Sequence, residues 1–127
     1  MLLNLTDLSD EPLQSQIVRQ VRAHILAGNL RAEDGLPSIR SMAREQRVSV
    51  ITVQRAYEAL MQEGLIHARR GKGFFVAALA QREKHDMARE RLRDNLTPPI
   101  KAALAEGLER EDVIDAVESI LKEEPGK

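Results

Sequence analysis

The fold is decided by residues 36–76, which read LPSIRSMAREQRVSVITVQRAYEALMQEGLIHARRGKGFFV. Two serines in this stretch, Ser38 and Ser49, each precede apolar residues at helical spacing and are typical helix N-caps. The first predicts a short helix over 39–46, and the second predicts a longer helix that ends at Gly64. The longer helix has one apolar face, formed by Val53, Ala56, Tyr57, Leu60 and Met61. We therefore expect Tyr57 to pack in the core.

The residues that follow have the composition of β-strands. Residues 65–69 and 74–76 flank a Gly-Lys-Gly turn centred on Lys72, which predicts a β-hairpin. Upstream, apolar residues recur every four positions from Leu13 to Ile25, which predicts a helix between Pro12 and Gly28. This order of a helix, a short helix, a longer helix and a hairpin is typical of a winged helix-turn-helix. We expect a mainly α fold with a small β-hairpin, and a winged helix-turn-helix domain over residues 1–78.

Residues 79–127 are helical in pattern and highly charged. Apolar residues keep a four-residue spacing from Ala88 to Leu104 through Pro98-Pro99, which predicts one kinked helix or two nearly collinear helices. A second apolar stripe follows the break at Gly107 and is closed by Pro125-Gly126. Two such stripes make a poor core, so we expect them to pack against each other and against a second copy of the chain. The expected dimerisation residues of this helical arm are Leu92, Leu96, Ile100, Leu104, Val113, Val117, Ile120 and Leu121.

Length and composition exclude several classes of protein. A chain of 127 residues suits one small domain with an appendage rather than a large catalytic fold. The absence of cysteine excludes disulfides, thiolate zinc sites, iron-sulfur clusters and a cysteine nucleophile. The apolar runs are too short for a membrane span, and the first residues lack the pattern of a signal peptide. We expect a cytoplasmic protein without a membrane partner.

The net charge of −1 hides an uneven distribution along the chain. Residues 38–76 carry seven basic and three acidic residues, while residues 1–37 carry three and five. Residues 77–127 carry nine basic and twelve acidic residues. This division is expected of a chain in which one module faces nucleic acid and another faces a partner.

The start of the longer helix carries side chains suited to the major groove of DNA. Arginine pairs with guanine, glutamine pairs with adenine, aliphatic groups contact the thymine methyl, and hydroxyl groups bind phosphate. Taken alone, this helix face is equally consistent with an ordinary solvated surface. The basic, glycine-rich hairpin after it favours DNA, because its backbone can approach phosphate or the minor groove. The predicted DNA-binding residues are Ser38, Arg40, Arg44, Ser49, Val50, Ile51, Thr52, Gln54, Arg55, Arg69, Arg70, Gly71, Lys72 and Gly73.

The whole stretch resembles the signature of the GntR family of bacterial winged-helix transcription factors. The matching motifs, in order and spacing, are Leu36-Pro37-Ser38-Ile39-Arg40, Val48-Ser49, Arg55-Ala56-Tyr57, Glu63-Gly64-Leu65-Ile66 and Arg70-Gly71-Lys72-Gly73-Phe74-Phe75-Val76. The resemblance covers residues 11–76 and implies a transcriptional regulator, most often a repressor, that binds a pseudo-palindromic operator as a homodimer. The short helical tail resembles the YtrA-like subfamily, in which two helices serve dimerisation. The family also implies a small-molecule effector, although this tail shows no aromatic-lined pocket for one.

The sequence departs from the family pattern at several positions. Ile39 stands where an acidic residue is common, and Val50 and Gln54 stand where arginine is common, so base readout is expected to differ from that of relatives. The usual Pro-Gly-Asp turn is replaced by residues 32–35, Ala-Glu-Asp-Gly, with Gly35 as its turn glycine. Arg47 stands where glycine is frequent, and a left-handed backbone there would cost about 1 kcal/mol relative to glycine.

Other functions fit the sequence less well. Gly71-Lys72 lacks the spacing of a phosphate-binding P-loop, because Ile66 replaces its first glycine and Gly73 replaces its serine or threonine. The three histidines lack metal-ligand spacing, so we expect no catalytic residues, metal or cofactor. A second hypothesis is a helical adaptor whose winged domain binds protein. The excess of basic residues around the hairpin disfavours an adaptor, and a salt titration of DNA binding discriminates the two.

Overall fold

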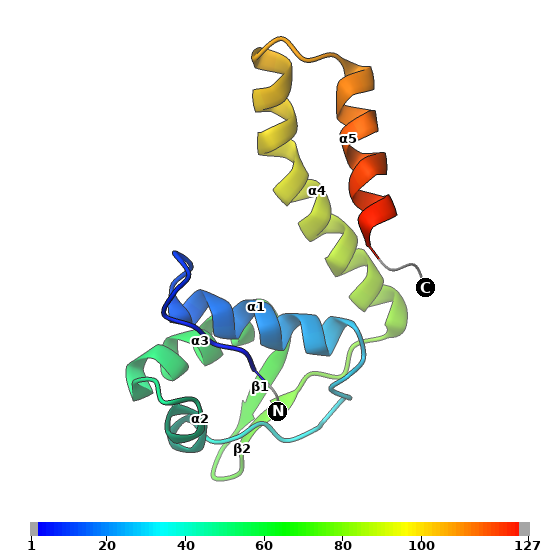
Figure 1. The fold of residues 1–127 in the computed structure, drawn as a ribbon. Coiled ribbons are helices and arrows are strands. Elements are labelled where there is room, and N and C mark those ends of the chain that lie inside the picture. The colour runs from blue at the N-terminus through cyan, green and yellow to red at the C-terminus, as the bar shows by residue number, and fades with distance from the viewer. Residues whose placement is uncertain (1–2, 125–127) are drawn as a thin grey trace. The chain divides into compact units, whose positions relative to one another are not determined.

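The computed structural model describes residues 3–124, and within them the chain forms two compact units, one ending at His85 and one starting at Asp86 (Figure 1). The elements are helices α1 (Leu13–Leu26), α2 (Ile39–Gln46) and α3 (Val50–Gln62), strands β1 (Ile66–Arg69) and β2 (Gly73–Val76), and helices α4 (Gln81–Ala105) and α5 (Arg110–Glu123). The predicted fold class, mainly helical with one small hairpin, is confirmed. The outer ends of the two predicted domains, including the helix stop at Pro125-Gly126, lie outside the described residues. Among the described helices, none is both long and apolar enough to cross a membrane.

The helix ends follow from local chemistry. The Ser38 hydroxyl accepts a hydrogen bond from the Ser41 backbone N–H at 3.0 Å, and the Ser49 hydroxyl accepts one from the Thr52 N–H at 3.0 Å. Each serine thus satisfies one of the N–H groups that a helix start leaves without a partner. Both predicted N-caps are confirmed, and Gly64 follows α3 with a φ of 77°.

The core of the N-terminal unit forms where α3 packs against α1 and α2. Its largest fully buried side chain is Tyr57, which is 1 % exposed. The Tyr57 hydroxyl donates a hydrogen bond to the Pro37 carbonyl at 2.7 Å, and the ring meets Phe74 edge-on at 4.9 Å between centroids. Burial raises the pKa of the Tyr57 hydroxyl, so it stays a donor. The expectation that Tyr57 packs in the core is confirmed. Aliphatic side chains complete this core: Ile17, Val21, Ile25, Met42, Val53, Leu60, Leu65 and Val76.

The hairpin is antiparallel, with Ile66 opposite Val76 and Arg69 opposite Gly73. Residues 33–36 run along the free edge of β2, where the Leu36 N–H donates to Phe74 O and the Val76 N–H donates to Asp34 O, both at 2.9 Å. Gly35 was expected as the turn glycine, but it lies just after the turn, and the left-handed residue is Glu33, with a φ of 67°. The bend falls at Glu33 because its N–H donates to Val76 O at 2.8 Å, which leaves Gly35 in the extended part that pairs with Phe75.

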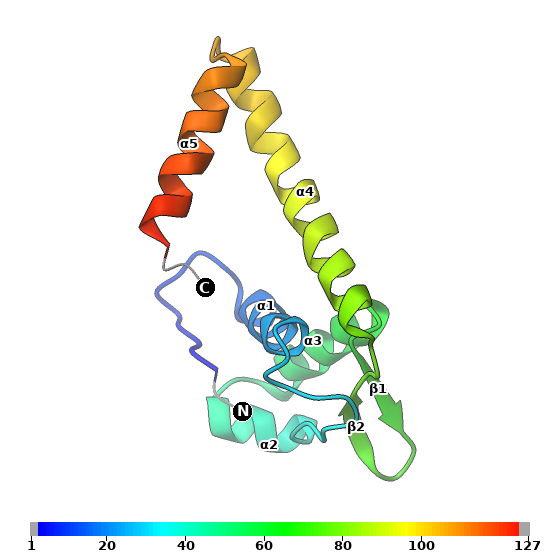
Figure 2. The same cartoon turned by 90° about the vertical axis from the view of Figure 1, so that its right-hand side faces the viewer.

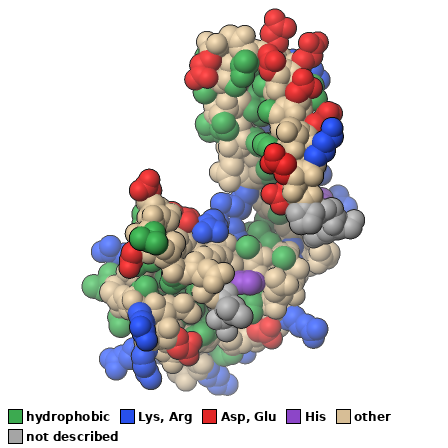
Figure 3. All heavy atoms as spheres, in the orientation of Figure 1, with side chains coloured by type: hydrophobic (Ala, Val, Ile, Leu, Met, Phe, Trp, Pro, Cys, Tyr) green, Lys and Arg blue, Asp and Glu red, His purple; other side chains and the backbone are tan. Residues whose placement is uncertain are grey.

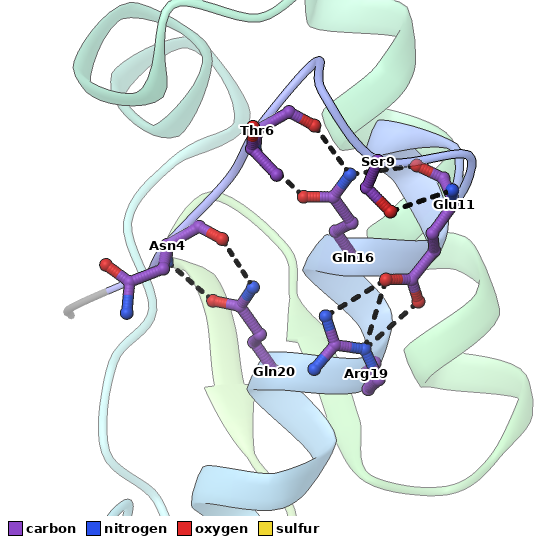
Figure 4. Close-up of polar contacts among 7 residues, drawn as sticks. All are labelled: Asn4, Thr6, Ser9, Glu11, Gln16, Arg19 and Gln20. Carbon is purple, nitrogen blue, oxygen red and sulfur yellow. Dashed lines mark hydrogen bonds and ion pairs between the residues drawn. The ribbon is translucent and has the colours of Figure 1, made fainter.

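The segment before α1 is fixed to that helix by two glutamines (Figure 4). Gln16 is 1 % exposed; its side-chain oxygen accepts from the Thr6 N–H at 2.9 Å, and its amide nitrogen donates to the carbonyls of Thr6 and Glu11 at 2.8 Å. One turn later, Gln20 makes the same pair of bonds to the backbone of Asn4, at 2.7 and 2.8 Å. The spacings agree, since four residues of helix and two residues of extended chain both span about 6 to 7 Å.

The described part of the C-terminal unit is a pair of helices, α4 from Asp86 onward and α5. Of the two alternatives predicted for the first stripe, the structure shows one continuous helix through Pro98 and Pro99. Just before the two prolines, the Thr97 hydroxyl donates a hydrogen bond to the Arg93 carbonyl at 2.7 Å. A turn at Gly107 follows, and the Asp112 carboxylate then accepts from the Glu109 N–H at 2.8 Å where α5 begins.

The apolar stripes of α4 and α5 are not buried against each other in the single chain. The two helices splay apart from the turn that joins them (Figure 2), and neither contains a buried residue. Of the eight residues expected in a dimer interface, Ile100 and Val113 are half-buried, and Leu92, Leu96, Leu104, Val117, Ile120 and Leu121 are exposed. Helical spacing correctly placed these residues on two helices, but the expected packing of one stripe on the other is absent here.

Candidate nucleic-acid interface

The first two turns of α3 present an exposed face opposite the core. Val50 and Ile51 are 46 % and 59 % exposed, and Gln54 and Arg55 are exposed beside them. The amide of Gln54 donates to the Glu58 carboxylate at 3.3 Å, so its side chain lies along the helix. This face offers methyl groups, one amide and one guanidinium, the groups that read base edges in a major groove.

Hydroxyl groups gather at the two helix starts. Ser38 caps α2, while Ser49 caps α3 and lies 2.8 Å from the Thr52 hydroxyl. Tyr57 joins the two starts, because its hydroxyl binds the carbonyl of Pro37, the residue before Ser38. The hydroxyl of each cap accepts from the backbone; Ser38 keeps its own proton for donation, while one of the Ser49 and Thr52 hydroxyls donates to the other and leaves one proton for the pair to donate. A helix start with free N–H groups and hydroxyl donors suits a phosphate oxygen.

Three arginines lie exposed on and after α2. Arg40 and Arg44 are one turn apart on the helix, and Arg47 ends it with a φ of 57° and a ψ of 46°. This left-handed conformation is the one considered for Arg47 from the sequence. Basic side chains gather along the edge of the N-terminal unit that carries α2 and the hairpin (Figure 3). The predicted residues Arg40 and Arg44 are thus two exposed cations on the helix that precedes α3.

The hairpin tip consists of Arg70, Gly71 and Lys72. The Lys72 N–H donates to Arg69 O at 2.9 Å, and the flanking glycines at 71 and 73 have φ values of 75° and 109°. Open space surrounds the position of a Cβ at both glycines. Phosphate can therefore approach this backbone closely, which a side chain at either position would hinder. Arg70 and Lys72 are both exposed.

Arg69 differs from the other basic residues of the hairpin. Its guanidinium forms an ion pair with the Glu33 carboxylate and lies 4.8 Å from the centre of the Phe75 ring. His67 Nε2 lies 3.2 Å from the other oxygen of Glu33. Sequence reasoning missed this role of Glu33. The signal was an acidic residue in a turn where the family pattern has glycine.

The structure thus brings the predicted DNA-binding residues onto one unit, on α2, α3 and the hairpin. Among residues 3–124, no group of three histidine, aspartate or glutamate side chains is arranged to hold a metal ion.

Residues 13–76 match the model of a protein family described as bacterial regulatory proteins, gntR family. The chain belongs to the GntR family. Members of this family are DNA-binding regulators of transcription, and this chain is one of them. The resemblance inferred from the motifs of residues 36–76 is confirmed.

Relatives of similar length cover the chain almost completely. It is 30 % identical over 116 residues to the uncharacterized HTH-type transcriptional regulator YhcF of Bacillus subtilis, which covers 87 % of this chain and 91 % of YhcF. It is 27 % identical to the HTH-type transcriptional repressor YtrA of the same organism, over 94 % of this chain and 92 % of YtrA. The probable rhizopine catabolism regulatory protein MocR of Rhizobium meliloti is 44 % identical over 71 residues, 56 % of this chain. The matched region is only 14 % of MocR, so that relative is informative for the winged domain alone.

Solved structures show the same relationship. A GntR family transcriptional regulator from Listeria monocytogenes superposes with a TM-score of 0.74 at 26 % identity, over 87 % of this chain and 96 % of that one. The DNA-binding domain of AraR, solved in complex with operator ORX1, superposes with a TM-score of 0.52 at 26 % identity, over 59 % of this chain and 93 % of AraR's. The first covers the helical tail as well as the winged domain, and the second covers a length typical of the winged domain.

Proposed function

We propose that this GntR-family regulator is a repressor that binds a pseudo-palindromic operator as a homodimer, using residues 1–78 to bind DNA and residues 79–127 to dimerise. The observation that supports the DNA-binding part of this proposal is the exposed start of α3. Aliphatic, amide and guanidinium groups there share the N-terminal unit with two hydroxyl-capped helix starts and a basic hairpin. Val50 and Ile51 are exposed at this start, where they are available to contact base edges.

Apart from Arg69, which is paired with Glu33, the predicted DNA-binding residues divide into two roles. Val50, Ile51, Gln54 and Arg55 are proposed to face base edges, with Arg55 or Gln54 supplying roughly 1 to 3 kcal/mol of discrimination at one base pair. The residues proposed to hold phosphate and fix the register are Ser38, Arg40, Arg44, Ser49, Thr52, Arg70, Gly71, Lys72 and Gly73.

The proposed dimer rests on the exposed apolar residues of α4 and α5. A shallow hollow on α4 is lined by the apolar residues Leu92, Leu96 and Ile100. Charged residues of both signs line it as well, including Arg89, Glu90, Arg93 and Lys101. A twofold axis places the same patch on both partners, so a patch with both charges can complement itself. A second copy would also remove from water apolar surface that the single chain leaves exposed.

Repression, location and the lack of enzymatic activity are parts of the same proposal. The relative YtrA is named a repressor, and a winged domain similar to this one was solved on operator DNA. A protein that works on operator DNA works in the cytoplasm of a bacterium. We propose no catalytic residue, no metal and no cofactor.

The experiment is selection of bound sequences from random duplex DNA, followed by footprinting on the selected sequence. We expect two inverted half-sites whose centres lie about one helical turn, ~34 Å, or a multiple of it apart. An Arg70→Ala, Lys72→Ala variant serves as control and is expected to bind the same sequence more weakly. One asymmetric half-site bound at full affinity would contradict the dimeric operator, and no enrichment at all would contradict specific DNA binding. In a reporter strain, the selected operator placed over a promoter should lower expression only when the protein is present.

A further inference from the structure

Glu33 occupies a backbone conformation that rarely suits a glutamate. Its φ of 67° lies in the left-handed region, where every residue with a Cβ atom meets a steric cost that glycine avoids. A non-glycine residue in this region points to a constraint from its surroundings. The backbone constraint is plain, since the Glu33 N–H donates to Val76 O. That bond needs no carboxylate, so the side chain requires its own explanation.

The Glu33 side chain lies on the solvent face of the hairpin. In the register of the two strands, His67 is opposite Phe75 and Arg69 is two residues further along β1, so these three side chains share one face. The other face carries Phe74, which meets Tyr57 of the core. The Glu33 carboxylate contacts His67 and Arg69 of this solvent face, one with each oxygen.

We propose that Glu33 is an internal competitor for DNA phosphate, which holds Arg69 and thereby withholds one cation of the hairpin from the DNA. This inference rests on the proposed DNA-binding function. Arg69 directly precedes the hairpin tip at residues 70–72, so it is within the basic segment that the winged domain offers to DNA. Carboxylate and phosphate oxygens both bind the same planar N–H donors of a guanidinium. Occupation by Glu33 therefore excludes a close phosphate contact with the same donors.

The ion pair between Glu33 and Arg69 is weak enough for a DNA phosphate to compete with Glu33. The side chains of Arg69 and Glu33 are 49 % and 43 % exposed, and ion pairs at such exposure contribute little because water screens them. The Arg69 guanidinium also lies over the Phe75 ring, 4.8 Å from the ring centre, and this contact does not depend on Glu33. Removing the charge of Glu33 should therefore leave Arg69 on the hairpin but free for phosphate.

The test compares the wild type with Glu33→Gln, which keeps the shape of the side chain and loses its charge. Binding of a labelled duplex that carries the selected operator is measured from 50 to 200 mM salt, and the slope of log affinity against log salt is determined. One added phosphate contact steepens this slope by about 0.9 and enlarges the loss of affinity across that range roughly 3.5-fold. We expect this steepening for Glu33→Gln, with tighter binding at the lowest salt. Adding Arg69→Ala to Glu33→Gln should return the slope to the wild-type value.

Glu45→Gln is the matched control. Glu45 is an exposed carboxylate of α2 in the same unit, and among residues 3–124 it forms no ion pair with a lysine or arginine. Its loss changes the net charge equally but frees no cation, so the slope should change by much less than 0.9. An unchanged slope for Glu33→Gln would overturn the proposal. An equal increase in Glu45→Gln, or in the double variant with Arg69→Ala, would also overturn it, because general charge would then be the cause. Wild-type binding to the operator tests the proposed function separately.

Discussion

Leu92→Ala should weaken the proposed dimer strongly while leaving the single chain nearly as stable. Leu92 lines the hollow on α4 and is 60 % exposed. Full burial of a leucine side chain contributes about 1.5 to 3 kcal/mol, so covering the exposed 60 % contributes roughly 0.9 to 1.8 kcal/mol. A twofold dimer contains the residue twice, which doubles the effect to about 1.8 to 3.6 kcal/mol. The dissociation constant should therefore rise by roughly 20-fold to 400-fold.

Sedimentation equilibrium over a dilution series measures this constant directly. Leu8→Ala is the matched control, because Leu8 is 97 % exposed and lies in the segment before α1. It is expected to leave dimerisation unchanged. A chain that ends at Ala78 should be monomeric and should bind the operator more weakly. The reasoning is refuted if the intact chain is a monomer at micromolar concentration, or if Leu92→Ala dimerises as tightly as the wild type.

Three further predictions follow from the N-terminal unit. Arg70→Ala should weaken binding to all sequences and flatten the salt slope by about one unit, whereas Arg55→Ala should relax preference at one or two base pairs per half-site. Binding profiles over single-base operator variants check this, and parallel profiles for both variants would show that Arg55 only holds phosphate. Gln16→Ala should lower the free energy of unfolding by about 2 to 3 kcal/mol, because it leaves three backbone groups without their bonds. Gln20→Ala, whose bonds are exposed, should cost less than about 1 kcal/mol; equal losses in urea unfolding would contradict the role of burial. Arg47→Gly should stabilise the chain by up to about 1 kcal/mol by relieving the left-handed strain, and a loss of stability would show that the Arg47 side chain contributes more than its backbone costs.

Much of the winged domain was predictable because its signals are local. A serine N-cap acts within three residues, as the bonds from Ser41 to Ser38 and from Thr52 to Ser49 show. Helical spacing then identified the buried face that includes Tyr57, since one face of a helix must lose contact with water when it packs. The exposed start of α3 followed from the same geometry, as the side opposite that face.

The features that escaped prediction join residues far apart in sequence. Gln16 lies on the same helix stripe as polar surface residues, and no local signal shows that its amide binds the backbone at Thr6. The packing of the helical tail could not be predicted for a different reason. Spacing defines which residues of α4 and α5 share a face, but it does not specify whether the other helix or another chain covers that face.

Glu33 shows how a departure from a family pattern carries information that the pattern itself cannot. The family pattern has a glycine in this turn, and Gly35 was the nearest glycine in the sequence. The hydrogen bonds to β2 instead require the left-handed residue at Glu33, which the sequence does not favour there. The contacts of the Glu33 carboxylate with Arg69 and His67 are too exposed to contribute much to folding, so they do not explain the left-handed backbone. If Glu33→Gln proves more stable or equally stable while its salt slope steepens, the carboxylate acts on DNA affinity rather than on folding.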